Sequence, residues 1–123
     1  MSDQILANIK GIILDMDGVL WRDSQALLDM PSFFTGLKNL DIPVVFATNN
    51  GTRSITMYVE RLAGFGVIVE PWQVVTSALA TADYLAKRFP ERGRIFIVGE
   101  RGVIEAIQDQ GFELADQFGD DVL

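Results

Sequence analysis

The sequence predicts an α/β protein built on a doubly wound, Rossmann-like and mainly parallel sheet. Short apolar runs of strand length, at residues 12–14, 44–47 and 94–98, alternate with longer segments whose apolar residues recur at helical spacing. The first two runs also stop abruptly at small polar residues. Strands that alternate with helices are typical of parallel sheets with right-handed crossovers.

Composition indicates a compact globular protein and excludes several kinds of chemistry. The 123 residues are 49% hydrophobic, which is enough for one real core. A formal charge of −7 disfavours nucleic acid and anionic lipid as partners. The chain has no Cys and no His, so catalysis would use carboxylates, hydroxyls, amides and cations. No apolar run has the length of a signal peptide or membrane span, and we expect a soluble, cytoplasmic protein.

The first strand is expected at residues 10–15. Its apolar run is long enough for a strand buried on both faces and too short for a helix. The run stops at Asp15 and Asp17, followed by Gly18. Ligands bind at the carboxyl ends of strands in open α/β sheets, so these acids are the first candidates for chemistry.

The next elements follow from turn residues and helical spacing. Residues 18–28 are expected to form a loop or small flap, because polar residues interrupt the apolar ones. Pro31 suits the first turn of a helix that ends near Asp41. A second strand at 44–47 then stops at Thr48 and the residues after it.

The remaining chain predicts three more helices and further short strands. Gly64 or Gly66 supplies a helix stop, and Pro90 closes another helix. The expected helices are 54–63, 78–89 and 102–110, and the β-like pieces are 67–69, 74–76 and 94–98.

Polar residues at the ends of two strands suggest a phosphate site. Taken alone, Asp15 and Asp17 could be ordinary turn residues, and Thr48 and Asn49 could be turn or capping residues. The presence of polar residues at the ends of both strands is more informative, because the second strand leads into a helix. Its hydroxyl, amides and backbone N–H groups would then converge on one anion-sized space. A divalent cation held by the acids would complete the site.

Residues 12–21 and 45–53 resemble the first and second motifs of the haloacid dehalogenase-like hydrolases. The closer likeness is to the branch of nitrophenylphosphatase-like and phosphoglycolate phosphatase-like enzymes, whose cap follows the second motif. Thr76-Ser77, Val98-Gly99-Glu100 and Gly111-Phe112 are similar to that branch too. The resemblance spans almost the whole chain.

The resemblance implies a Mg²⁺-dependent phosphatase that acts on a small phosphorylated metabolite through an aspartyl-phosphate. Asp15 would be the nucleophile, and Asp17 would protonate the leaving alkoxide and then activate water. Mg²⁺ would bridge the Asp15 carboxylate, the Asp17 carbonyl and the phosphate.

The same resemblance assigns the phosphate contacts. Thr48 and Asn49 would hold the transferring oxygens, with the main chain of Asp17 and Gly18 nearby. Arg53 would lie just inside a helix that starts at this site, although a surface arginine is the more ordinary interpretation.

The resemblance also implies an incomplete domain, with residues 1–77 as the N-terminal half of the core and 78–123 as the beginning of an α/β cap. The family's downstream lysine and metal-binding acid lie outside these residues, and Asp120-Asp121 is a poor substitute for the acid. An inactive fragment with weak metal or phosphate affinity is therefore one alternative, and a receiver-like phosphoacceptor module is another. An open sheet edge would favour a homo-oligomer, unless strand 94–98 joins the main sheet.

Overall fold

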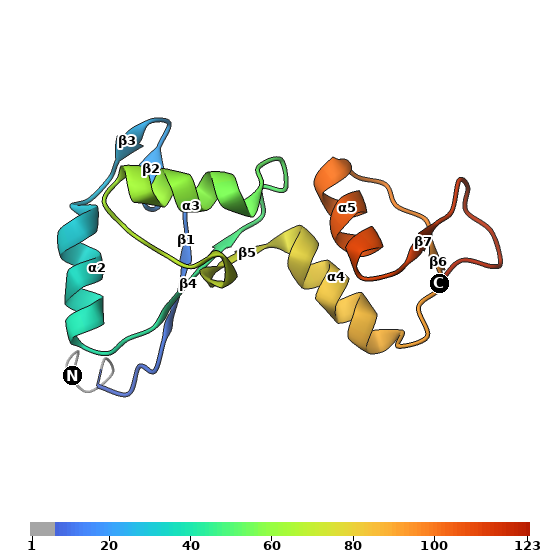
Figure 1. Ribbon diagram of the computed structural model, residues 1–123, viewed down its shortest axis with the longest axis horizontal. Helices are drawn as coiled ribbons and strands as arrows, with labels where there is room; N and C mark the ends of the chain where they lie inside the picture. Colours follow the sequence, from blue (N-terminus) through green and yellow to red (C-terminus); the bar gives the residue numbers. More distant parts are fainter. Residues whose placement is uncertain (1–6) are drawn as a thin grey trace. The chain divides into compact units, whose positions relative to one another are not determined.

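The computed structural model describes residues 7–123, which form two compact units (Figure 1). The first unit consists of the described residues up to Thr48 together with Ile55–Val75. The second consists of Asn49–Ser54 and Thr76–Leu123. The predicted division between core and cap after residue 77 stays a prediction.

The first unit is built on a three-stranded sheet with the order β1-β4-β5. β1 pairs with β4 in parallel, from Ile12 opposite Val44 to Asp15 opposite Ala47. This confirms the predicted α/β class with a parallel sheet. The strands are β1 (Ile12–Asp15), β4 (Val44–Thr48) and β5 (Val74–Thr76).

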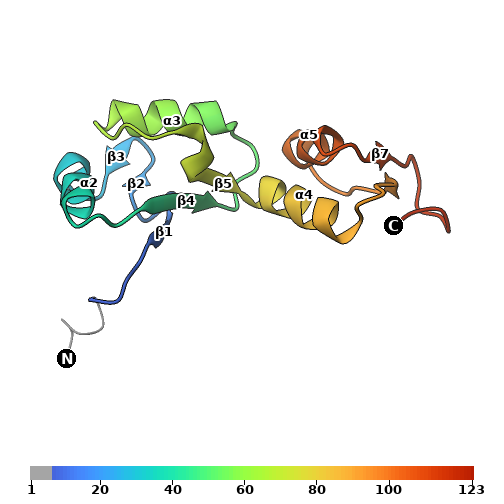
Figure 2. The same cartoon turned by 60° about the horizontal axis from the view of Figure 1, so that its bottom comes forward.

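Two helices cover one face of this sheet. α2 (Met30–Asn39) connects β1 to β4, and α3 (Ile55–Gly64) follows β4 along the chain. Figure 2 shows α3 lying above β4. Large apolar side chains from both helices pack with the inward side chains of β4. The buried members of these three elements are Met30, Leu37, Val44, Phe46, Tyr58 and Leu62.

The opposite face of the sheet corrects the expectation that β1 is buried on both sides. Ile12 and Leu14 pack against the core cluster, whereas Ile13 is 77% exposed. Side chains alternate across a strand, and the described residues of this unit cover only the face toward α2 and α3. β1 is also an edge strand of the described sheet. Oligomerisation through that edge stays a prediction.

α2 begins and ends where the sequence predicts. The Asp29 carboxylate accepts a hydrogen bond from the Ser32 N–H at 3.1 Å, which caps the first turn. Pro31 occupies the first turn, where a missing N–H costs nothing. Asp41, just after the helix, has a φ of 54°, and Asp tolerates this left-handed conformation better than most residues do.

The expected flap at residues 18–28 is a short hairpin of β2 (Trp21–Arg22) and β3 (Gln25–Ala26). Each strand has only two residues, too few for a periodic pattern to reveal. Asp23 in the connecting turn has a φ of 51°, as two-residue hairpin turns require. Trp21 is 1% exposed, so the hairpin carries part of the core.

The β-like piece predicted at 67–69 is wrong. Val67 is buried and Ile68 is 83% exposed, so the residues alternate as in a strand, but they pair with none of the described strands. A short 3₁₀ turn, η1 (Pro71–Gln73), follows instead. The Gln73 side chain donates a 3.0 Å hydrogen bond to the Val44 carbonyl. A side-chain contact thus ties this segment to β4.

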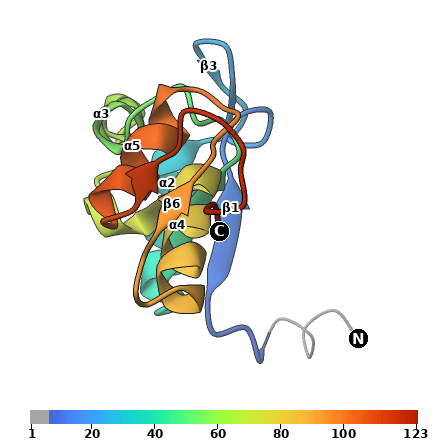
Figure 3. The same cartoon turned by 90° about the vertical axis from the view of Figure 1, so that its right-hand side faces the viewer.

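The second unit contains α4 (Ser77–Arg88), α5 (Arg101–Asp109) and the parallel pair of β6 (Arg94–Ile95) and β7 (Glu113–Leu114). Figure 3 shows β6 in front of α4 and α5, which pack together on one side of it. Their buried cluster is Ala78, Ala82, Ile95, Ala106, Ile107 and Phe112.

The strand predicted at 94–98 is therefore shorter than expected, and it lies in a sheet of its own with β7. Only Arg94 and Ile95 have register partners in β7, and Val98 is 90% exposed. Across residues 7–123, no helix is long and apolar enough to cross a membrane.

Candidate active site

The two predicted catalytic acids lie at the carboxyl end of β1: Asp15 is its last residue, and Asp17 follows it. Met16 stands between them and is fully buried, whereas Asp15 and Asp17 are exposed. The Met16 N–H donates to Oδ1 of Asp15 at 2.8 Å. The buried methionine thus anchors the backbone, and its amide holds the carboxylate that is predicted to act as nucleophile.

Asp17 is held by the hairpin that follows it. Oδ1 of Asp17 accepts a 2.9 Å hydrogen bond from the indole Nε1–H of Trp21. The Gly18 N–H donates to the Trp21 carbonyl at 2.7 Å, and Gly18 has a φ of 82°, which favours glycine. This N–H, predicted to lie near the phosphate, is therefore already used within the turn.

Thr48 lies at the carboxyl end of β4, the edge of the sheet that also carries Asp15, because the two strands are parallel. Thr48 is only 6% exposed, and its Oγ1 lies 3.5 Å from the Tyr58 hydroxyl of α3. Asp15 pairs with Ala47, one residue earlier, so strand alternation places Thr48 on the helix-covered face. The sheet brings the two strand ends together, but the hydroxyl points toward α3.

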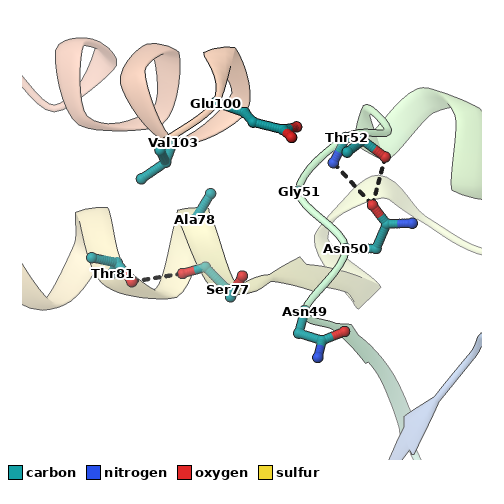
Figure 4. A pocket seen from close by; sticks show the side chains of 9 residues that line it. All are labelled: Asn49, Asn50, Gly51, Thr52, Ser77, Ala78, Thr81, Glu100 and Val103. Atoms are coloured by element: carbon teal, nitrogen blue, oxygen red, sulfur yellow. Dashed lines mark hydrogen bonds between the residues drawn. The ribbon is translucent and has the colours of Figure 1, made fainter. Parts of the chain in front are cut away.

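Asn49 belongs to the second unit, where it borders a pocket of about 320 Å³ (Figure 4). The loop after β4 forms one side of the pocket, and the start of α4 forms another. Glu100 and the first turn of α5 form the third side. The lining residues are Asn49, Asn50, Gly51, Thr52, Ser77, Ala78, Thr81, Glu100 and Val103.

Hydrogen bonds within this pocket shape its polar walls. Asn50 Oδ1 accepts from both the N–H and the hydroxyl of Thr52, at 3.1 and 2.5 Å, which folds the loop into a tight turn. Thr81 donates its hydroxyl to the Ser77 carbonyl at 2.8 Å. The Glu100 carboxylate adds a negative charge.

Arg53 lies in a bend two residues before α3 and not just inside that helix, as was expected. Asp121, already a poor substitute for the metal-binding acid by its place in the sequence, forms an ion pair with Arg94 in the second unit.

The donor types at the end of β1 fit Mg²⁺, which prefers oxygen ligands and binds through one or two carboxylates completed by water and substrate phosphate. Asp15 offers a carboxylate and Asp17 a carbonyl. Within the described part of the chain, no group of three or more acidic side chains gathers into a metal site. A magnesium ion here would therefore take further ligands from phosphate and water.

Sequence reasoning missed two features of these sites. One is the hydrogen bond from the Trp21 indole to Asp17. The signal that could have indicated this hydrogen bond is the spacing: Trp21 carries an N–H donor and stands four residues after Asp17, across a turn that contains Gly18. Glu100 in the pocket had no comparable signal, because it follows no recognisable spacing from the loop after β4.

Comparisons with known proteins cover most of the chain. Residues 12–113 match the family described as haloacid dehalogenase-like hydrolase. The ribonucleotide monophosphatase NagD of Escherichia coli is 34% identical over 108 residues, which are 88% of this chain and 42% of the relative. Phosphoglycolate phosphatase 1A of Arabidopsis thaliana is 28% identical over 113 residues, 91% of this chain and 31% of the relative. The chain thus spans less than half the length of these relatives.

Solved structures show the same likeness. A hypothetical protein from Pyrococcus horikoshii is 38% identical with a TM-score of 0.74, over 85% of this chain and 40% of the other. The p-nitrophenyl phosphatase from Archaeoglobus fulgidus is 34% identical with a TM-score of 0.74, over 87% of this chain and 41% of the other. By its motifs, its sheet and its match over residues 12–113, this chain belongs to the haloacid dehalogenase-like hydrolases.

Proposed function

We propose that this chain carries the nucleophile, the acid/base and phosphate-binding groups of a Mg²⁺-dependent phosphatase that acts on small phosphomonoesters. The observation that carries the proposal is the pair of exposed acids at the carboxyl end of β1, at the edge where β4 also ends. Relatives named as phosphatases support it. If the chain is instead an inactive fragment, it should show no turnover in the experiment below.

The reaction has two steps. A carboxylate oxygen of Asp15 forms a bond to phosphorus while the bond to the leaving oxygen breaks, and Asp17 gives its proton to that oxygen. Asp17, now ionised, takes a proton from water, whose oxygen attacks phosphorus and releases phosphate and the Asp15 carboxylate. Asn49 and Arg53 would contact the phosphoryl oxygens, and Thr48 would do so once its hydroxyl turns away from Tyr58. Bound Mg²⁺ would neutralise charge on the phosphate.

The experiment is hydrolysis of p-nitrophenyl phosphate by this chain, with Mg²⁺ and with excess chelator. We expect metal-dependent turnover that Asp15→Asn abolishes. The control is Asp41→Asn, which removes the same charge at an exposed residue before β4, at the other end of the strand, and whose φ of 54° suits Asn. Equal turnover in Asp15→Asn and the control would overturn the proposal, and so would a folded chain without turnover.

The receiver-like alternative has no supporting observation. It expects a further acid at the end of a later strand of the same sheet, whereas β6 pairs with β7 in a separate sheet.

A further inference from the structure

The indole of Trp21 is held rigidly beside Asp17. Its ring is 1% exposed and stacks on Phe65, with the ring centroids 5.7 Å apart. The Arg61 guanidinium lies 4.6 Å from the centroid of the Trp21 ring. Arg61 also donates a hydrogen bond to the Asp23 carbonyl in the hairpin turn. A stacked ring, a cation and the hairpin thus fix where the indole N–H points.

This N–H makes the two oxygens of Asp17 different. An indole nitrogen can donate a hydrogen bond but cannot accept one. Oδ1, which lies 2.9 Å from Nε1, therefore has to be an acceptor whether the carboxyl group is ionised or protonated. A carbonyl oxygen accepts more strongly than the O–H oxygen of a carboxylic acid, so this bond favours Oδ2 as the site of a proton on Asp17.

We propose that Trp21 is a positioning residue that makes Oδ2 of Asp17 the oxygen that gives and takes the proton in the phosphatase reaction. The inference rests on the proposed function, because it specifies how the acid of that reaction is oriented. Without the indole N–H, the carboxyl group of Asp17 is free to rotate, and a proton on either oxygen is equally favourable. A misplaced donor lowers the rate of the step that needs the proton.

The kinetic test compares two substrates. Trp21→Phe keeps an aromatic ring for Phe65 and Arg61 but removes the N–H. p-Nitrophenolate leaves without a proton, whereas an alkyl phosphomonoester such as glycerol 1-phosphate needs one. We expect Trp21→Phe to lower kcat/KM about tenfold for the alkyl ester and far less for p-nitrophenyl phosphate. The tenfold loss is part of the roughly 100- to 10,000-fold that acid–base catalysis supplies. An equal loss on both substrates, or none, would overturn the inference.

Trp72→Phe is the matched control, because Trp72 is 69% exposed and lies in η1, outside the hairpin that holds Asp17. It should leave the ratio of the two kcat/KM values unchanged. Thermal unfolding of both variants shows whether the fold is retained.

A second readout needs no turnover. Three-bond NMR couplings should show one χ1 rotamer for Asp17 in the unsubstituted chain and rotamer averaging in Trp21→Phe. In Asp17→Ala, an exposed substitution that leaves the core intact, the Trp21 indole proton should lose the downfield shift of a carboxylate-bound N–H. An averaged Asp17 rotamer in the unsubstituted chain would overturn the positioning role. Absence of turnover alongside a single rotamer would instead overturn the proposed function.

Discussion

The two units of this chain reach their cores by different means. In the first unit the largest fully buried side chains are Trp21, Tyr58, Phe46, Met16, Leu20, Met30 and Leu62. The second unit relies on Ala78, Ala82 and Ala106 where α4 and α5 meet, with Ile95, Ile107 and Phe112 beside them. Burying a large apolar side chain stabilises by about 1.5–3 kcal/mol, and an alanine contributes much less.

The difference matters for the chemistry that each unit carries. Asp15 and Asp17 stand on either side of a buried methionine and beside a buried tryptophan, so their backbone is fixed by large apolar groups. The pocket in the second unit is lined by a turn and by the ends of helices that approach through small residues. We therefore expect the first unit to lose the most stability when a core side chain is truncated. The second unit should lose stability when a side chain is enlarged.

The largest expected effect comes from emptying the core of the first unit. Phe46 is fully buried and contacts Phe34, with ring centroids 5.5 Å apart, so Phe46→Ala should lower the free energy of unfolding by about 3–5 kcal/mol. Urea unfolding followed by circular dichroism measures the loss. Phe96→Ala in the second unit is the control, because Phe96 is 39% exposed and should cost much less. Similar losses in both variants would break the comparison.

A smaller effect is expected from adding a methyl group to helices of the two units. A Cβ on Gly102 in α5 would lie 2.4 Å from the Gly51 carbonyl oxygen, so the backbone must shift. Gly102→Ala should therefore destabilise by about 1–3 kcal/mol. A Cβ on Gly36 in α2 meets nothing within 4 Å, and Gly36→Ala should stabilise by up to about 1 kcal/mol through helix propensity. Thermal unfolding of both variants gives the signs, and two stabilised variants would contradict the predicted clash.

The sequence predicted most of the elements because their signals are local. The cap at Asp29, the apolar runs at 12–14 and 44–47, and the helical spacing of α2 to α5 all lie within short windows. The prediction that β1 is buried on both faces was wrong, because a run of apolar residues cannot show which face of the strand other elements cover. Ile13 is 77% exposed although it stands between two half-buried residues.

The candidate site was predictable only in part, for the same reason. Asp15 and Asp17 follow a strand in sequence, so their exposure after β1 could be expected. The orientation of Thr48 toward Tyr58, the hydrogen bond of Gly18 to the Trp21 carbonyl and the indole contact of Asp17 depend on how the hairpin and α3 pack. A motif gives the identity of such residues, and tertiary packing decides where their atoms point.

The smallest predicted effect concerns the starts of two helices. Asp29 caps α2, and hydrogen bonds from the Ser32 N–H and then from the Ser32 hydroxyl hold the pKa of this carboxyl below its ordinary value. Glu100 precedes α5 without a side-chain cap. A lowered pKa means that the ionised carboxylate stabilises the folded state. That contribution is present above the ordinary pKa and is lost as the pH falls through the lowered one.

Asp29→Asn isolates this contribution, because Asn is also a good N-cap but does not ionise near that pH. The stability difference between the unsubstituted chain and Asp29→Asn should therefore shrink as the pH falls from 7 to about 3, close to the range where Asp titrates. Urea unfolding at a series of pH values measures it. A difference for Asp29→Asn that grows toward acid would mean that the carboxylate opposes folding, and it would contradict the prediction.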